Sequence, residues 1–480
     1  MGGCPVKVLS VASECAPLVK TGGLADVVGA LPAALAGQGV EMRVLLPGYR
    51  PVLGAVGKGK KLVDLPDFFG GKAVLRAGQA AGLDLIVLDA PHLFDREGTP
   101  YLDPANHDWP DNPERFAALS WAACLVAAGE AGTWRPDVVH AHDWQAGFAP
   151  YYLKAHFGAP VPSVLTIHNI AFHGVVPVDR MANLRIEAKD YDREGVEFWG
   201  QISALKAGLV YADRLTTVSP TYARELTRAE FGMGMDGVIR SRDADFVGIL
   251  NGIDEEVWDP ASDPQITAYK SAKGKARNKA ALRKEFGLGE AEGPLCVVVS
   301  RLSDQKGLDL LLQALPALID RGGQLALLGS GDPGLEVAFT HAAEAHDNIA
   351  VKIGYDEGLS HRMMAGGDAI LVPSRFEPCG LTQLYGLRYG TVPVVALTGG
   401  LADTVIPASP AAIEAGVATG IQFHPVTADA LAHALMQLVD LYHRPEDWAR
   451  LQKNGMAQNV GWARSAAKYA EVYGELVAAA

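Results

Sequence analysis

Short runs of apolar, mostly β-branched residues alternate along the chain with longer stretches rich in alanine and leucine. The short runs predict strands, the longer stretches predict helices, and their alternation is typical of a parallel sheet with helices on both faces. In the first half, strands are expected at residues 6–12, 42–46, 85–88, 138–141, 163–167, 214–218 and 246–250. In the second half they are expected at 295–300, 324–328, 349–353, 369–372 and 392–395, with helices such as 308–320 and 381–388 between them.

The same pattern indicates two α/β domains that join near Asn251, after a buried strand and before a polar stretch. With 480 residues, the chain is too long for one ordinary hydrophobic core. The hexapeptide TGGLAD starts at Thr21 and again at Thr398, each time after an expected strand and at the start of an expected helix. This repeat favours two related halves, with chance similarity of two glycine-rich loops as the alternative.

Composition and charge exclude several classes of function. The net charge of -13 gives no general attraction for nucleic acid or for an acidic membrane surface, so an anionic substrate would need local cations. No apolar run is long enough to cross a bilayer, and the amino terminus lacks the pattern of a signal peptide. The five cysteines are scattered and form no CxxC pair, so a soluble protein of the reducing cytoplasm is expected.

Two loops carry groups that suit a diphosphate. Gly22 and Gly23 would let backbone amides approach a phosphate closely at the start of a helix, and Lys20 adds a positive charge beside them. Arg301 and Lys306 follow a buried strand and would stand at its carboxyl end, where they could neutralise a leaving diphosphate. A plain strand-to-helix turn is the alternative for the first loop, and a solvated charged loop is the alternative for the second.

A third segment, with the sequence PSRFEPCGLTQ, turns from a strand into a helix. The amides of Gly380, Leu381 and Thr382 would have no partner inside that helix and would be available to oxyanions. Glu377 could hydrogen-bond sugar hydroxyls or stabilise a positively charged sugar centre, or it could merely cap the helix. Cys379 is expected to be a small packing residue, because no histidine lies near it in sequence to activate it.

Several histidines lie at or after the ends of two expected strands. A metal site is one interpretation of this group, which contains His140, His142, Asp143, His168 and His173. Nothing among them has HExxH or Cys/His ligand spacing, so no metal is expected. His168 is instead interpreted as a hydrogen-bond donor to a reacting sugar, with a core histidine as the equal alternative. The chain also lacks GxxxxGK[ST], which disfavours a nucleotide-hydrolysing P-loop enzyme.

Taken together, the motifs resemble those of bacterial glycogen synthases of the starch synthase type, glycosyltransferase family 5. The resemblance is carried by KTGGL from Lys20, HDW from His142, IHN from Ile167, NGID from Asn251, the segment from Ser300 to Gly307, and EPCGLTQ from Glu377. These motifs stand in the family's order from residue 6 to about residue 405.

This resemblance implies the GT-B fold, an α/β fold of two Rossmann-like, doubly wound domains that face a deep cleft. It implies an acceptor-side domain at 1–250, a nucleotide-sugar domain at 251–456, and a last helix in 457–480 that packs back on the first domain. The implied reaction transfers glucose from ADP-glucose to the non-reducing end of an α-1,4-glucan such as glycogen, with retention of configuration and release of ADP.

The resemblance also implies site residues, without any cofactor, metal, nucleic acid or membrane partner. The implied catalytic residues are His168, Arg301, Lys306 and Glu377. The implied donor-binding residues are Lys20, Gly22, Gly23, Asn251, Tyr355, Cys379, Gly380, Leu381 and Thr382, and Asp143 and Trp144 match the acceptor side. The alternatives are a retaining GT-B glucosyltransferase that uses UDP-glucose and a catalytically inactive glucan-binding homologue.

Overall fold

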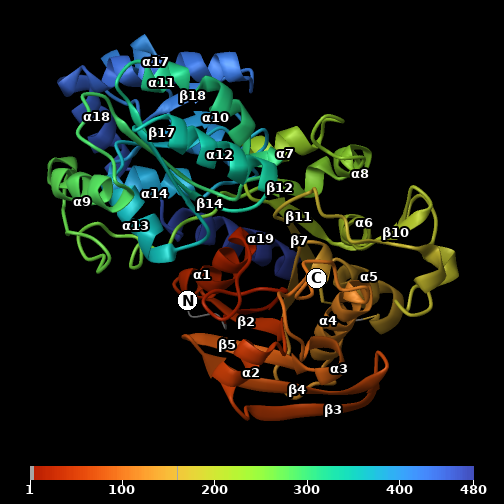
Figure 1. The fold of residues 1–480 in the computed structure, drawn as a ribbon. Coiled ribbons are helices and arrows are strands. Elements are labelled where there is room, and N and C mark those ends of the chain that lie inside the picture. The colour runs from red at the N-terminus through yellow and green to blue at the C-terminus, as the bar shows by residue number, and fades with distance from the viewer. Residues whose placement is uncertain (1–4, 159–160) are drawn as a thin grey trace. The chain divides into compact units, whose positions relative to one another are not determined.

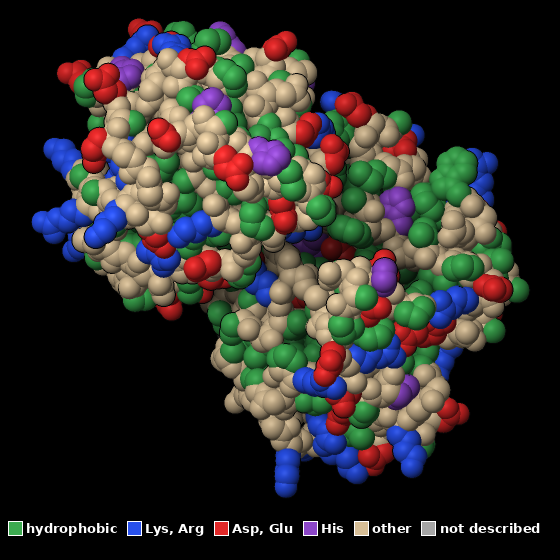
Figure 2. Space-filling view, in the orientation of Figure 1, with side chains coloured by type: hydrophobic (Ala, Val, Ile, Leu, Met, Phe, Trp, Pro, Cys, Tyr) green, Lys and Arg blue, Asp and Glu red, His purple; other side chains and the backbone are tan. Residues whose placement is uncertain are grey.

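The computed structural model describes residues 5–158 and 161–480, and the chain divides into two compact units. Unit 1 contains the chain up to Asn251 together with Trp462–Ala480, and unit 2 contains Gly252–Gly461. Each unit is an α/β domain built on one large sheet (Figure 1). On the visible face of each unit, Lys and Arg side chains are interspersed with Asp and Glu side chains (Figure 2).

The sheet of unit 1 has the spatial order β12-β11-β7-β6-β1-β2-β5-β4-β3, and its strands are parallel except at the β5-β4-β3 edge. A small antiparallel sheet has the order β8-β10-β9. The strands are β1 Val6–Val11, β2 Val40–Pro47, β3 Lys60–Phe68, β4 Gly71–Ala80, β5 Leu83–Asp89, β6 Val138–His142, β7 Ser163–Ile167, β8 Val175–Val176, β9 Glu197–Phe198, β10 Gln201–Ser203, β11 Arg214–Thr217 and β12 Phe246–Gly248. The α-helices are α1 Gly23–Ala36, α2 Arg50–Val56, α3 Pro91–Phe94, α4 Asn112–Ala128, α5 Phe148–Tyr152, α6 Ala204–Tyr211, α7 Pro220–Leu226, α8 Asp236–Ser241 and α19 Ala463–Ala479.

Unit 2 has an all-parallel sheet in the order β15-β14-β13-β16-β17-β18. Its strands are β13 Leu295–Val299, β14 Gln324–Gly329, β15 Ile349–Ile353, β16 Ala369–Val372, β17 Val392–Ala396 and β18 Ile421–Phe423. Its α-helices are α9 Ala276–Phe286, α10 Leu308–Ala314, α11 Pro316–Ile319, α12 Pro333–Ala345, α13 Glu357–Gly366, α14 Thr382–Tyr389, α15 Gly399–Thr404, α16 Pro410–Glu414, α17 Ala428–Tyr442 and α18 Pro445–Met456. Each strand expected from the hydrophobic runs is confirmed to within a few residues.

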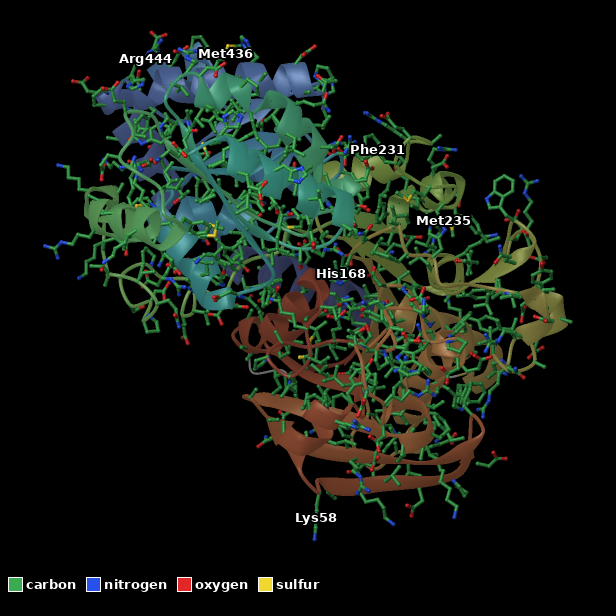
Figure 3. The ribbon with its side chains drawn as sticks, viewed as in Figure 1. Lys58, His168, Phe231, Met235, Met436 and Arg444 are labelled. Atoms are coloured by element: carbon green, nitrogen blue, oxygen red, sulfur yellow. The ribbon has the colours of Figure 1, made fainter. Side chains whose placement is uncertain are left out.

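The strands that the hydrophobic pattern missed are mostly exposed or half-buried, or are very short. β3 and β4 form an antiparallel hairpin at the sheet edge, and most of the β3 side chains are exposed or half-buried. Lys58, just before β3, points away from the sheet (Figure 3). The expected helix at 308–320 was wrong in one respect, because it is divided at Pro316, which begins a separate helix.

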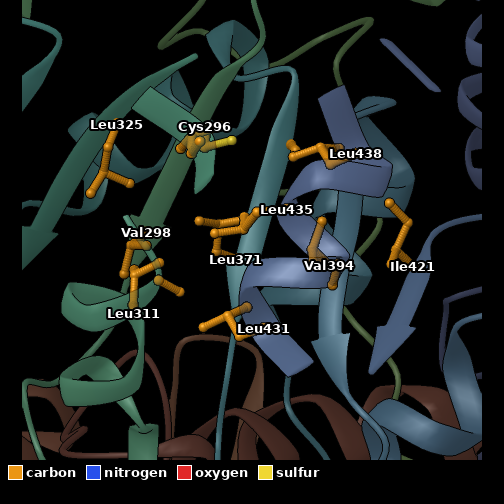
Figure 4. Close-up of a cluster of buried hydrophobic side chains, with 14 of the residues drawn as sticks. Cys296, Val298, Leu311, Leu325, Leu371, Val394, Ile421, Leu431, Leu435 and Leu438 are labelled. Carbon is orange, nitrogen blue, oxygen red and sulfur yellow. The ribbon is translucent and has the colours of Figure 1, made fainter. Parts of the chain in front are cut away.

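The core of unit 2 forms where α17 covers the sheet. Leu431, Leu435 and Leu438 recur at the helical period on one face of α17 and are completely buried. They face buried side chains of the strands, including Leu371 and Val394 (Figure 4). Because this sheet is buried on its faces, its strands read as continuous apolar runs, and the sequence pattern located them well.

The last helix, α19, belongs to unit 1 and lies beside α1 (Figure 1). Ala466, Tyr469 and Tyr473 are fully buried in the same hydrophobic cluster as Val8 and Leu31. Among the described residues, no helix combines the length and the apolar character that crossing a bilayer demands.

Candidate active site

In unit 2, two loops meet at the carboxyl ends of the neighbouring strands β13 and β16. The Lys306 ammonium donates to Oε2 of Glu377 at 2.6 Å, and the Ser374 hydroxyl donates to the same oxygen at 2.9 Å. The Glu377 side chain is 9% exposed and that of Lys306 is 19% exposed, so the ion pair is largely shielded from water. An oriented cation therefore lies at the edge of the sheet where ligands of doubly wound folds bind.

The backbone around this pair is held in place from several directions. Gly307 has a φ of 63°, and a Cβ there would lie 2.1 Å from the Pro373 carbonyl oxygen, so the two loops approach each other closely. The Arg375 guanidinium donates to both carboxylate oxygens of Asp309, at 2.7 and 2.6 Å. The Arg375 amide also donates to the Gln305 carbonyl at 2.9 Å. These contacts preorganise Lys306 and Glu377.

The start of α14 follows directly. Gly380 has a φ of 71°, and the first intrahelical bond runs from the Tyr385 amide to the Leu381 carbonyl. The amides from Leu381 through Thr382 and onward into the first turn therefore have no partner within the helix and carry its positive end. The side-chain amide of Gln383 donates to the carbonyls of Cys379 and Gly380, which fixes the turn.

The structure decides two alternatives that the sequence left open here. Glu377 does not cap α14, because its carboxylate binds Lys306 and Ser374 and the N-cap position is Leu381. Cys379 is 4% exposed and is a buried packing residue, as expected.

Arg301 and Tyr355 also follow strands of this sheet. Arg301 comes just after β13 and is exposed. Its carbonyl accepts from the Ser300 hydroxyl at 3.1 Å, but its guanidinium makes no hydrogen bond or ion pair to any residue that the structure describes. Tyr355 follows β15, and its side chain is 75% exposed with the hydroxyl donating to Glu357. Arg301 follows β13 directly, as the Lys306 loop does, whereas β14 separates β15 from β13.

In unit 1, the glycine-rich loop after β1 is organised by a carboxylate. Glu14, which is 3% exposed, accepts hydrogen bonds from the amide and hydroxyl of Thr21, from the Gly22 amide at 3.3 Å, and from the hydroxyl of Tyr101. Lys20 pairs with Asp26 at 2.8 Å. The loop is thus preformed by an internal anion.

The two glycines of this loop are not required by packing. A Cβ at Gly22 or at Gly23 would meet no atom within 4 Å, and Gly22 has an extended φ of -157°. Glycine at such a position leaves room for the close approach of a ligand to the backbone.

A histidine cluster occupies the neighbouring strand ends of β6 and β7. Nδ1 of His142 lies 3.0 Å from Nε2 of His168, and Nε2 of His140 lies 2.6 Å from the Thr166 hydroxyl. Burial lowers the pKa of His140 and of His168 to about 3, so all these rings are neutral near pH 7. Across the described residues, no three His, Cys, Asp or Glu side chains form a group that could hold a metal ion.

The two residues expected on the acceptor side have structural contacts. Asp143 has a φ of 53°, and its carboxylate accepts the His168 amide at 2.6 Å. Burial raises the pKa of Asp143 to about 7. The half-buried Trp144 ring meets Phe116 edge-on at 5.1 Å and covers Gly174.

Asn251 and Ser303 each have a buried oxygen without a partner. Asn251 Oδ1 and Ser303 Oγ make no hydrogen bond to any residue that the structure describes. Because buried polar atoms are normally paired, both are candidates to contact a ligand. Ser303, Ser374, Glu14 and Tyr101 were missed by the sequence reasoning. Ser303 and Ser374 lie inside recognised motifs and Glu14 lies just before one, but nothing in the sequence marks Tyr101.

Comparisons with known proteins show which family the chain resembles. Residues 7–241 match the family model of the starch synthase catalytic domain, and residues 281–456 match the model of glycosyl transferases group 1. Glycogen synthases from Paracoccus denitrificans (strain Pd 1222) and Jannaschia sp. (strain CCS1) are both 62% identical to this chain. The alignments cover 98% and 97% of this chain and 100% and 98% of those proteins.

Two solved structures are similar over 99% of this chain and 100% of theirs. The catalytic domain of starch synthase IV from Arabidopsis thaliana, bound to ADP and acarbose, superposes with a TM-score of 0.86 at 31% identity. A sucrose-phosphate synthase from Thermosynechococcus elongatus, with a TM-score of 0.62 at 21% identity, shares the fold. With its two α/β domains and its near-complete match to curated relatives, the chain belongs to the glycogen synthase family of GT-B glycosyltransferases.

Proposed function

We propose that this protein transfers glucose from ADP-glucose to the non-reducing end of an α-1,4-glucan such as glycogen, retaining the anomeric configuration and releasing ADP. The cluster of Lys306, Ser374 and Glu377 beside the amides of α14 carries this proposal. A preorganised cation and the start of a helix together stabilise the negative charge that develops on a leaving diphosphate.

Each element of the cluster has a role in this reaction. Lys306 and Arg301 neutralise the departing diphosphate, and the amides of Gly380, Leu381 and Thr382 bind its oxygens. Exclusion of water strengthens each of these interactions, because the local dielectric constant falls.

The remaining residues hold the substrates. Glu377, His168 and Asn251 bind the donor glucose, Tyr355 stacks on the adenine, and Cys379 packs beneath the turn. Lys20, Gly22 and Gly23 assist at the diphosphate, and Asp143 and Trp144 face the acceptor glucan. The unpaired oxygen of Asn251 supports its assignment, because a sugar hydroxyl would satisfy it.

We propose that the glucan hydroxyl attacks the same face of the glucose from which the diphosphate departs, and that no covalent enzyme intermediate forms. The departing phosphate oxygen takes the proton of the attacking hydroxyl. Retention of configuration then needs a positioned leaving group, which the Lys306 cluster would provide.

The donor assignment specifies the nucleotide as ADP. The similar starch synthase IV domain was solved with ADP and acarbose, which supports an adenine nucleotide for this chain. The exposed ring of Tyr355 offers a stacking surface at the same strand edge. We also place the protein in the cytoplasm, in keeping with the buried thiols of Cys15, Cys124 and Cys296, which form no disulfide.

The test supplies glycogen with either ADP-glucose or UDP-glucose and measures the nucleotide released. ADP release with new α-1,4 linkages, identified by NMR of the product, is the expected result, and a chelator should leave the rate unchanged. Release of UDP alone would replace the donor assignment, and β linkages would refute retention. Glycogen binding without turnover of either donor would establish an inactive glucan-binding homologue.

A further inference from the structure

Three buried polar side chains form a hydrogen-bonded chain across neighbouring strands of unit 1. Ser10 on β1 has its hydroxyl oxygen 3.1 Å from Nε2 of His142, at the end of β6. The other ring nitrogen of His142, Nδ1, lies 3.0 Å from Nε2 of His168, which follows β7. The exposed fractions are 1%, 0% and 9%, so water does not compete along the chain.

The direction of the hydrogen bonds follows from counting protons. Burial lowers the pKa of His168 to about 3 and lowers that of His142 well below its usual value, so each ring carries one proton near neutral pH. Within the described part of the chain, His142 is the one hydrogen-bond partner of the Ser10 hydroxyl. If that hydroxyl accepted a proton from His142, its own O–H would be a buried donor without an acceptor, which is unfavourable.

Ser10 therefore donates to Nε2 of His142, and the His142 proton must reside on Nδ1. That proton is donated to Nε2 of His168, so the His168 proton resides on its own Nδ1. Among the residues that the structure describes, none is hydrogen-bonded to His168 Nδ1.

We infer that Ser10 and His142 are positioning residues that fix His168 as the Nδ1–H tautomer, so that it presents a hydrogen-bond donor to a sugar hydroxyl oxygen. The assignment of the sugar as its partner rests on the proposed function, whereas the tautomer rests on the geometry alone. If the direction of these hydrogen bonds were reversed, Nδ1 of His168 would be an acceptor. It could then no longer donate a hydrogen bond to a sugar hydroxyl oxygen.

A second histidine chain in the same sheet provides a matched control. The Tyr473 hydroxyl lies 2.8 Å from Nδ1 of His140, and Nε2 of His140 lies 2.6 Å from the Thr166 hydroxyl. This second set of hydrogen bonds also joins a buried histidine to hydroxyl groups, but among the described residues no hydrogen bond connects it to His168.

The test is ¹⁵N NMR of the full chain labelled at histidine, without substrate, with the His168 signals assigned by their loss in His168→Gln. In the wild type, Nδ1 of His168 should be protonated and Nε2 unprotonated. Ser10→Ala should shift the proton of His168 toward Nε2, Ser10→Thr should restore the wild-type pattern, and Tyr473→Phe should leave it unchanged.

Activity provides the second readout. With ADP-glucose and glycogen, Ser10→Ala should lose about tenfold in kcat/KM, the value of one hydrogen bond, and Ser10→Thr should recover it. A wild-type His168 protonated at Nε2 would overturn the inference even if no Ser10 variant folds. A changed tautomer with unchanged kcat/KM would overturn the donor role of His168. A wild type that transfers no glucose would refute the proposed function and leave the tautomer result intact.

Discussion

The Lys306–Glu377 pair has a proposed role in catalysis and a role in stability. Lys306→Ala should lower kcat by about two to three powers of ten, since a preorganised electrostatic contact in the transition state is worth about 3 to 4 kcal/mol. It should also destabilise unit 2, because the largely buried Glu377 carboxylate would keep only the Ser374 hydroxyl as a partner.

Steady-state kinetics with ADP-glucose and glycogen, together with thermal unfolding, measure the two effects. The matched control is Arg321→Ala, which removes an exposed ion pair to Asp440 in the same unit and should change neither quantity appreciably. A loss of kcat below tenfold in Lys306→Ala would remove Lys306 from the catalytic residues.

The buried histidines of unit 1 make its stability depend on pH. His140 and His168 titrate near 6.5 when unfolded and at about 3 when folded, so between these values the unfolded state binds more protons. Their contribution to stability is complete above pH 6.5 and is lost as the pH falls toward 3, by about 1.4 kcal/mol per pH unit for each histidine. Asp143 acts in the opposite direction, because its pKa is raised to about 7 and the folded state keeps its proton longer.

The two histidines outweigh the single carboxylate, so unit 1 should unfold at lower urea concentration at pH 4.5 than at pH 7. Asp143→Asn keeps the side-chain oxygen that accepts the His168 amide but removes the opposing titration. This variant should therefore show a steeper loss of stability in acid. A urea midpoint that does not depend on pH between 4.5 and 7 would contradict the prediction.

Particular residues show how far sequence reasoning reaches. Lys306 and Glu377 could be predicted, because each follows a clear apolar strand and parallel strands end at a common edge. The role of Glu14 could not be predicted, because one of its partners, Tyr101, is 87 residues away in sequence. Contacts between distant loops depend on the tertiary structure, and a single sequence gives no measure of them.

At the scale of elements, the two TGGLAD copies have the same letters and different physical roles. Gly399 and Gly400 pack against backbone, because a Cβ would lie 1.9 Å from the Glu377 carbonyl oxygen and 2.2 Å from that of Cys379. Gly22 and Gly23 face open space. The sequence predicted a strand-to-helix loop for both copies but could not distinguish a packing role from space for a ligand.

Alanine substitution should separate these roles. Gly399→Ala should cost at least about 1 to 3 kcal/mol of stability and most of the activity, because φ is 45° and the displaced carbonyl belongs to Glu377. Gly22→Ala should leave thermal stability unchanged and raise the KM for ADP-glucose. Equal thermal destabilisation by the two substitutions would show that Gly22 has a structural role that the open space does not suggest.

The fold class could be predicted at the scale of the whole molecule because buried parallel strands and their covering helices leave strong patterns. The strands of the β3–β4 hairpin are mostly exposed or half-buried and left a weak hydrophobic pattern, and β18 is only three residues long. Helix α19 is an intermediate case. Its buried positions Ala466, Tyr469, Tyr473 and Leu476 recur at the helical period, which predicts one buried face but not the unit that covers it.

The placement of α19 in unit 1 predicts that the end of the chain stabilises the beginning. Deletion of residues 462–480 would expose the cluster that includes Val8 and Leu31 and would leave Nδ1 of His140 without the Tyr473 hydroxyl. Loss of even one large buried side chain costs about 2 to 5 kcal/mol, so unit 1 of the truncated chain should be largely unfolded.

Hydrogen exchange measured by mass spectrometry should show lost protection in β1, β6 and β7, with protection retained in β13 to β17. Val477→Ala, at a position 38% exposed on the same helix, is the control and should exchange like the wild type. Equal loss of protection in both units would show instead that the two units fold as one cooperative body.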